Sequence, residues 1–168
     1  MKRLLLPIAL GLAALATTSC ATTNLVQVWR DPSYSPAPVK RVFVVAVIPY
    51  AQDRLHFENA IAESLAKKNF EVATSSGIVP PDLSGNDRIV AYVKEMGVDL
   101  VVVLRLVTAH GAWYGATDIN VYAAQRNSEW PVWSGTSSTS SFSTAQEAAA
   151  SVAASLLHGL ITAQILVR

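Results

Sequence analysis

The residue with the clearest chemical consequence is Cys20, the only cysteine among the 168 residues of the chain. It follows a basic start, Met1 to Arg3, an apolar run over residues 4–16, and the small polar residues Thr17 to Ser19. This order of segments is the layout of a secretory signal peptide, which is removed after export. We therefore predict that residues 1–19 are a signal peptide and that Cys20 becomes the new N-terminus.

The position of this thiol resembles the lipidation site of bacterial lipoproteins, although Thr17 stands where that site usually has an aliphatic residue. The rival interpretations are a plain signal peptide that is cut nearby and a membrane span. The apolar run of about 13 residues is shorter than the roughly 20 residues that a spanning helix needs. Two or more acyl chains hold a protein stably on a bilayer. Palmitate or similar chains on Cys20 would therefore attach this protein to a membrane.

Ala21 follows the cysteine. In lipoproteins of enteric-type bacteria, an aspartate at that position favours retention at the inner membrane, so Ala21 favours the outer membrane, with the domain facing the periplasm. The chain has a formal net charge of +1, and removal of Lys2 and Arg3 with the signal leaves it near neutral. A near-neutral domain lacks the basic footprint of a nucleic-acid-binding protein, so we expect no nucleic-acid partner.

Signatures of catalysis are missing from the sequence. It has no Gly-x-Ser-x-Gly, no His-Glu-x-x-His, no phosphate-binding glycine loop and no cysteine pair. The three histidines, His56, His110 and His158, fall in different predicted elements. We therefore expect a protein that is not an enzyme, with no catalytic residues, no cofactor and no metal site.

Two places could instead bind a ligand or a partner. Arg105 comes late in an apolar strand, near the C-terminal sheet edge where α/β folds bind ligands; the plainer alternative is an arginine that emerges into solvent. Trp113 and Tyr114 lie between Gly111 and Gly115, and aromatic side chains on such a loop are candidates for a partner contact. The alternative is that they cover their own hairpin.

Hydrophobic periodicity predicts the elements that position these residues. An unbroken apolar run without alternation indicates a strand that is buried on both faces, whereas apolar residues every three or four positions indicate a helix. By these rules we expect strands over residues 41–49, 70–75 and 98–107, with helices over 52–69 and 87–96 between them. Alternation over 118–125 and a return over 130–138 predict a hairpin, and Thr144 with Glu147 predicts the capped start of a helix to about residue 166.

The predicted fold class is α/β. The domain is a single three-layer-like unit, in which a parallel β-α-β-α-β core precedes an antiparallel hairpin and a long C-terminal helix. Residues 20–39 are expected to be a lipid-anchored tether with a short edge strand over 25–29, and residues 40–168 to be the periplasmic domain. Trp29, Trp130 and Trp133 lie in strand-like segments, where we expect them to pack. Arg54 and Glu58 are four apart on a predicted helix and can pair.

Several short segments together are familiar: Val28 to Pro32, Lys40 to Val47, Arg54 with Glu58, Gly97 to Val103, and Pro131 to Gly135. The chain resembles a family of small, mostly uncharacterised bacterial outer-membrane lipoproteins. It is similar in layout to the curli-secretion lipoprotein, to the lipoprotein activators of penicillin-binding proteins, and to the N-terminal domain of the Tol translocation protein. The resemblance implies a compact α/β domain that binds envelope proteins, and it carries over no catalytic residue. The amphipathic hairpins of the curli channel have no counterpart in this sequence.

These observations lead to one principal hypothesis and one alternative. The first is a lipid-anchored, periplasm-facing accessory or scaffolding subunit of a cell-envelope complex, which acts by binding an envelope protein or further copies of itself. The alternative is a module that binds a small ligand or a cell-wall glycan at the C-terminal sheet edge near Arg105. A hydrolase is disfavoured because no nucleophile and base are paired by their spacing.

Overall fold

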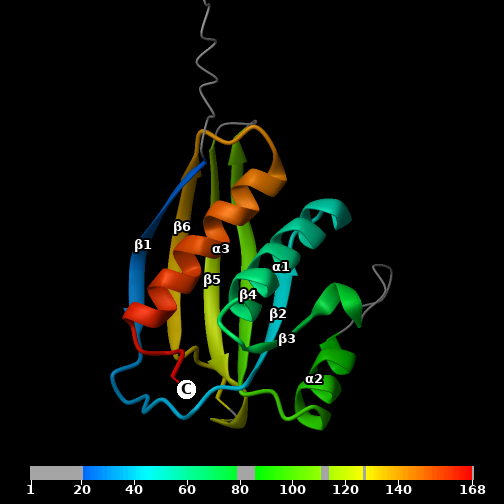
Figure 1. Ribbon diagram of the computed structural model, residues 1–168, viewed down its shortest axis with the longest axis vertical. Helices are drawn as coiled ribbons and strands as arrows, with labels where there is room; N and C mark the ends of the chain where they lie inside the picture. The colour runs from blue at the N-terminus through cyan, green and yellow to red at the C-terminus, as the bar shows by residue number, and fades with distance from the viewer. Residues whose placement is uncertain (1–20, 79–85, 111–113, 127, 168) are drawn as a thin grey trace, which may run out of the picture.

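The computed structural model describes residues 21–78, 86–110, 114–126 and 128–167. Within them, one mixed sheet has the strand order β1-β6-β5-β4-β2-β3, and α1 and α3 lie side by side across one face of it (Figure 1). The elements are β1 (Thr22–Arg30), β2 (Arg41–Val47), α1 (Ala51–Ala66), β3 (Glu71–Thr74), η1 (Ser75–Gly77), α2 (Asn86–Glu95), β4 (Leu100–His110), β5 (Tyr114–Ala123), η2 (Ala124–Arg126), β6 (Trp133–Ser140) and α3 (Ala145–Thr162).

The predicted fold class is confirmed. Strand β2 pairs in parallel with both β3 and β4, while β5 pairs antiparallel with β4 and β6. The chain moves outward from β2 to β3 through α1 and then back to β4 through α2. Right-handed crossovers in opposite directions place the two helices on opposite faces of the sheet. The ring of Tyr92 on α2 accordingly lies 5.3 Å from that of Phe43, whose neighbours Val42 and Val44 belong to the core beneath α1 and α3. The result is three layers.

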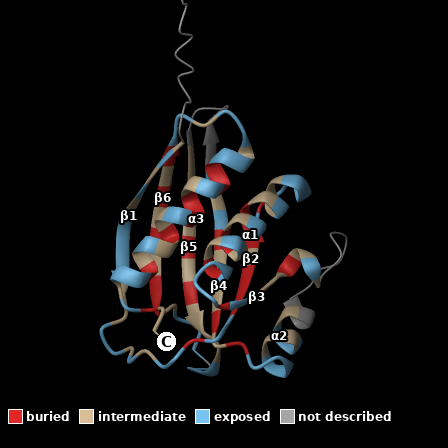
Figure 2. Ribbon diagram, viewed as in Figure 1, coloured by how far each residue is buried: buried red, intermediate tan, exposed pale blue. Residues whose placement is uncertain are grey.

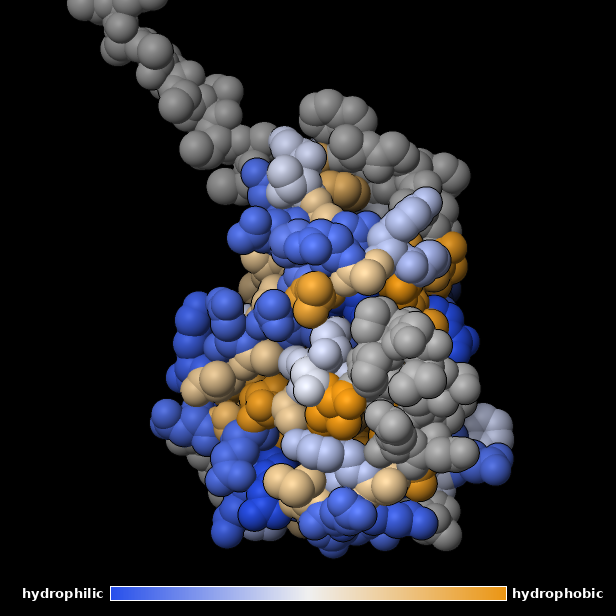
Figure 3. All heavy atoms as spheres, turned by 90° about the vertical axis from the view of Figure 1, so that its right-hand side faces the viewer, coloured by the Kyte–Doolittle hydropathy of each residue, from blue (hydrophilic) through white to orange (hydrophobic). Residues whose placement is uncertain are grey.

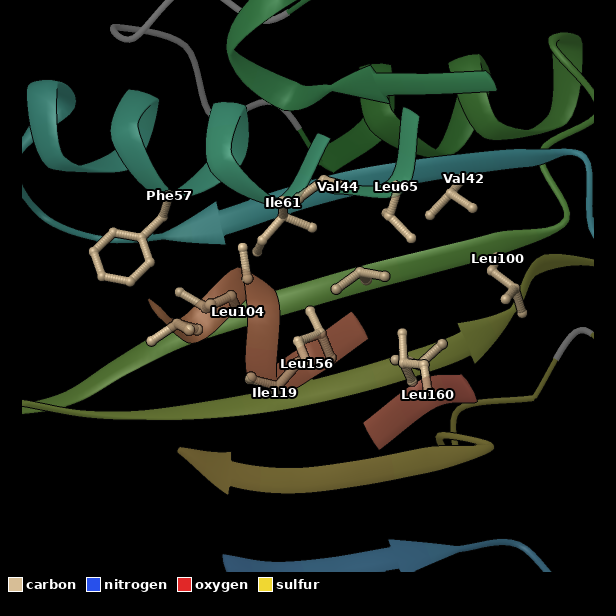
Figure 4. Close-up of a cluster of buried hydrophobic side chains, with 14 of the residues drawn as sticks. Val42, Val44, Phe57, Ile61, Leu65, Leu100, Leu104, Ile119, Leu156 and Leu160 are labelled. Carbon is tan, nitrogen blue, oxygen red and sulfur yellow. The ribbon is translucent and has the colours of Figure 1, made fainter. Parts of the chain in front are cut away.

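The core lies between the sheet and the pair α1 and α3. The predicted stripe on α1, Phe57, Ile61 and Leu65, is buried, and it points toward side chains of β2, β4 and α3 (Figure 4). Buried residues line the inward side of α3 as well (Figure 2). The capped start of α3 is also present, since Thr144 Oγ1 accepts a hydrogen bond from Glu147 N at 3.2 Å.

Strand β1 extends further than the short edge strand expected over residues 25–29. Strand Thr22–Arg30 runs along β6, with Thr22 to Val26, Trp29 and Arg30 paired to it, so part of the segment interpreted as a tether belongs to the sheet. Two serines of α3 hold its start, because Ser151 Oγ donates to Ala21 O and Ser155 Oγ donates to Thr23 O, both at 3.0 Å. The pairing is interrupted between Val26 and Trp29, where Gln27 has a φ of 51°, as at a β-bulge.

The tryptophans differ from one another in burial. Trp133 is fully buried, as predicted, whereas Trp29 is 46% exposed and Trp130 is 79% exposed. The expectation that all three pack is therefore wrong for two of them. Trp29 lies opposite Ser134 on the sheet face away from α3, and Trp130 precedes β6 in a turn. Gly159 leaves room for Leu25 and for the buried ring, since a Cβ there would lie 2.7 Å from Leu25 Cδ1 and 3.3 Å from Trp133 Cζ2.

The loop that follows β1 is fixed by Asp31. Its Oδ1 accepts hydrogen bonds from Ser33 N at 2.8 Å and from Ser33 Oγ at 2.7 Å, and its Oδ2 forms an ion pair with Arg126. The Ser33 hydroxyl, followed by the Arg126 guanidinium, stabilises the ionised carboxylate and lowers the pKa of Asp31 from 3.8 to about 2.

This shift makes a prediction about acid stability. Because the folded pKa lies below the unfolded value of about 3.9, the contribution of Asp31 to stability is present above about pH 4 and is lost as the pH falls through 2. We expect Ser33→Ala to raise the pKa of Asp31 toward its unfolded value, as measured by NMR titration of the side-chain carboxyl. Ser128→Ala, which removes a serine hydroxyl from a different exposed segment, is the control and should leave the pKa of Asp31 unchanged. An unchanged pKa in Ser33→Ala would show that the hydroxyl does not hold this carboxylate.

Candidate functional site

The candidate site is a step in the sheet where β2 ends before its neighbour. Val47, the last residue of β2, pairs with Arg105, whereas β4 continues to His110. The carboxyl ends of parallel strands are where α/β sheets bind ligands. A cavity of about 460 Å³ opens at this step. It is lined by Val45, Ala46, Val47, Ile48, Pro49, Arg54, Ser75, Ile89, Arg105 and Leu106.

Arg105, the sequence-predicted candidate for a ligand edge, lies at this cavity with its residue exposed. A second arginine, Arg54, reaches the same cavity from the first turn of α1. Its Nε atom is buried and has no hydrogen-bond partner. Sequence reasoning did not assign Arg54 to the site, because only the packing of α1 beside the end of β2 brings the two guanidinium groups to one cavity.

The pairing of Arg54 with Glu58 is not formed as an ion pair within the described residues. The carboxylate is instead fully buried beside the cavity wall. Glu58 Oε1 accepts from Ala46 N at 2.9 Å and from Ser75 Oγ at 2.5 Å. Its Oε2 accepts from Ser76 N at 2.8 Å and from Ser76 Oγ at 2.5 Å. Each oxygen therefore has two donors, none of which is a cation.

The sequence contained a signal for this buried carboxylate. Glu58 lies three residues before Ile61 and seven before Leu65, which places it on the buried side of the predicted helix. The pair Ser75 and Ser76 directly follows β3, and such hydroxyl and amide donors are what a buried carboxylate requires. Neither observation alone predicts the contact, because it joins segments separated by 17 or more positions.

Helix α1 begins at the same edge. Its N-cap residue, Tyr50, makes no side-chain capping hydrogen bond, but Asp53 in the first turn offsets part of the partial positive charge of the first backbone amides. Pro49, one residue before Tyr50, lines the cavity. Within the described part of the chain, the lining has two arginines and no carboxylate, which gives the cavity a positive character.

Two other hollows have different chemistry. One, of about 290 Å³, lies between α1 and α3 and has a mainly apolar lining that includes Phe57 and Phe142. The other, of about 260 Å³, lies on the sheet face away from α3 and is lined by polar groups such as Asp118, Asn120 and Thr136. Neither of these two hollows gathers charged groups of one sign.

On the side of the domain that carries β3 and α2, Figure 3 shows hydrophobic residues interspersed with hydrophilic ones.

Other sequence-predicted residues are less fully placed. Cys20 and Trp113 lie outside the described residues. The backbone of Tyr114 begins β5 and pairs with Ser140, which also pairs with Thr22. The candidate partner contact and the start of β1 are therefore at the same end of the sheet (Figure 1).

The histidines do not come together. His56 lies on α1, His110 ends β4, and His158 lies on α3. No group of three or more metal-ligating side chains is present among the residues that the structure describes. In the same residues, no helix is both long and apolar enough to span a bilayer.

Comparison with known proteins identifies the fold and no family. No family model matches the chain, and no curated protein matches its sequence. The PelC dodecamer from Paraburkholderia phytofirmans is 14% identical with a TM-score of 0.56, over 83% of this chain and 96% of PelC. TolB from Acinetobacter baumannii has a TM-score of 0.46 at 11% identity, over 84% of this chain and 31% of TolB. Lipoprotein GNA1162 from Neisseria meningitidis has a TM-score of 0.46 at 14% identity, over 76% and 94%. The similarity to PelC shows a shared fold.

The contacts of Glu58 predict a large effect on stability. Glu58→Ala removes the acceptors of two backbone amides and two hydroxyls, so we expect a loss of about 3 kcal/mol in the free energy of unfolding. Glu63→Ala, at an exposed position of the same helix, should change it by less than about 0.5 kcal/mol. Urea unfolding of both variants measures the difference, and equal effects would contradict a structural role for the buried carboxylate.

Proposed function

We propose that this chain is a lipid-anchored, periplasm-facing subunit of an outer-membrane complex, which acts by binding proteins rather than by catalysis. The observation that carries the proposal is the start of β1 at Thr22, only two residues after the predicted lipid on Cys20. Two residues of chain span at most about 7 Å. A lipid on Cys20 would hold this end of the sheet directly at the bilayer.

The attachment of β1 to the domain makes this geometry rigid. The hydrogen bonds from Ser151 and Ser155 of α3 fix the backbone of residues 21–23, and Thr23 Oγ1 lies 2.8 Å from Thr139 Oγ1 of β6. A domain tied in this way has no tether along which to move away from the membrane. Tyr114 begins β5 at the same end, so a partner that contacts it lies at the membrane surface.

The outer edge of β1 supports binding to a second protein. Within the described residues, no strand pairs with this edge, and Val26, Val28 and Trp29 are each more than 40% exposed. Unpaired backbone groups beside apolar side chains favour the addition of a strand from another chain. PelC, which shares the fold, is a dodecamer in its structure, so further copies of this chain are one candidate for the partner.

A specific observation favours a second function, the binding of a small ligand or a cell-wall glycan at the carboxyl edge of β2 and β4. That observation is the cavity of about 460 Å³ that both Arg54 and Arg105 line. Its volume lies in the range of small-molecule sites. The two functions use different parts of the domain and can coexist.

Lipid attachment can be tested directly. In cells fed with radiolabelled palmitate, we expect label on the wild-type chain and none on Cys20→Ala, because the thiol is the acceptor. When cells are fractionated, we expect the wild type in the outer-membrane fraction and the variant in the soluble periplasmic fraction, since membrane attachment depends on the acyl chains. Label on Cys20→Ala, or an unchanged membrane fraction, would contradict the proposed anchor.

The partner can be tested by crosslinking in intact cells. With a photoreactive residue at position 114, we expect adducts with one dominant outer-membrane protein or with a second copy, identified by mass spectrometry. The control position is Met96, which is 47% exposed and lies near the start of β2, where Arg41 Nη1 donates to its carbonyl. Equal adducts at 96 and 114, or undiminished partner recovery by Trp113→Ala with Tyr114→Ala, would show that this end of the sheet is not the contact.

A further inference from the structure

We infer that the cavity at the carboxyl edge of β2 and β4 binds an oxyanion, a phosphate or carboxylate group, between Arg54 and Arg105. The inference rests on the second of the proposed functions and is independent of the protein-binding one. It adds the charge and the chemical class of the ligand.

The first support is the unsatisfied side chain of Arg54. Its Nε is buried without a hydrogen-bond partner, and a buried donor without an acceptor is unfavourable. A guanidinium presents its donors in a planar fork that matches two oxygens of a carboxylate or a phosphate. Because Nε itself is closed to solvent, an oxyanion in the cavity that Arg54 lines would be bound by the other donors of this guanidinium.

The second support is that neither arginine is held in an ion pair. Glu58, four residues further along α1, would be the usual partner of Arg54, but its oxygens are taken by Ala46, Ser75 and Ser76. Within the described residues, neither Arg54 nor Arg105 forms an ion pair. Asp118, which lies across from Arg105 on β5, accepts a hydrogen bond from Thr136 Oγ1 at 2.8 Å.

The third support is the direction from which the two cations come. Arg54 projects from a helix on one face of the sheet. Arg105 follows Leu104, which is fully buried in the core, so it emerges on the opposite face. Both arginines line one cavity, because β2 ends at Val47 and leaves the edge of β4 uncovered beyond that point.

The test measures binding of inorganic phosphate and of citrate to the detergent-solubilised full chain by isothermal titration calorimetry. We expect saturable binding to the wild type, weakened at least about tenfold by either Arg54→Gln or Arg105→Gln. Lys67→Gln removes one positive charge from an exposed position near the end of α1 and should leave the Kd unchanged. Arg54→Lys, which keeps the charge and loses the fork, should bind more weakly than the wild type and more tightly than Arg54→Gln.

A second arm distinguishes the sources of the anion. This arm uses the Cys20→Ala chain, because acyl chains on Cys20 would bind any vesicle. Arginine-dependent binding to phosphatidylglycerol vesicles but not to free phosphate or citrate would assign a lipid headgroup, and the reverse would assign a soluble ligand; both uphold the oxyanion. Arg105 is exposed, so Arg105→Gln carries the test if Arg54→Gln does not fold.

Three results would overturn the inference. These are no binding of phosphate, citrate or the vesicles by the wild type, equal loss in Lys67→Gln and the arginine variants, or arginine-independent binding. If the neutral disaccharide chitobiose binds at this cavity while the anions do not, the ligand-binding function stands and the oxyanion inference fails.

Discussion

The arrangement of the parallel half of the sheet depends on one buried carboxylate. Glu58 joins α1 to the end of β2 through Ala46 N, and to the turn after β3 through Ser75 and Ser76. A charge in the interior is costly unless it is fully hydrogen-bonded, so α1, β2 and η1 must keep their relative positions for all the donors to reach it. The same contacts affect the charge of the nearby surface, because among the described residues they leave Arg54 without an ion-pair partner.

The antiparallel half of the sheet has a different role. Strands β4 and β5 continue beyond the end of β2, and with β6 and β1 they form the end of the domain where residue 22 lies. The step between the two halves creates the cavity, and the longer strands carry the sheet from the cavity to the end nearest the predicted anchor. One sheet thus separates the cavity from the end of the domain that carries residue 22 by a fixed length of β-structure.

The sequence predicted most of this fold because its core elements have strong apolar patterns. The unbroken run in β2 and the stripe of Phe57, Ile61 and Leu65 each depend only on nearby residues. Strand β1 was underestimated because its outward residues are exposed and its partner β6 is rich in serine and threonine, so neither has a clear period. Arg105 could be placed at the carboxyl edge from strand order alone. Arg54 could not be placed there from the sequence. Its expected partner four residues along the helix, Glu58, instead accepts hydrogen bonds from residues more than 10 positions away in the chain.

The bulge in β1 has a consequence for the proposed attachment to a membrane. Lipid-anchored proteins share a two-dimensional surface and one orientation, so like edges meet far more often than in solution. A flat, unpaired edge would then favour unlimited ladders of strands. The irregularity at Gln27, with its positive φ, bends the edge and interrupts its hydrogen-bonding register. The segment before it, Thr22 to Val26, keeps a regular edge of limited length, which favours short and finite contacts over fibrous aggregation.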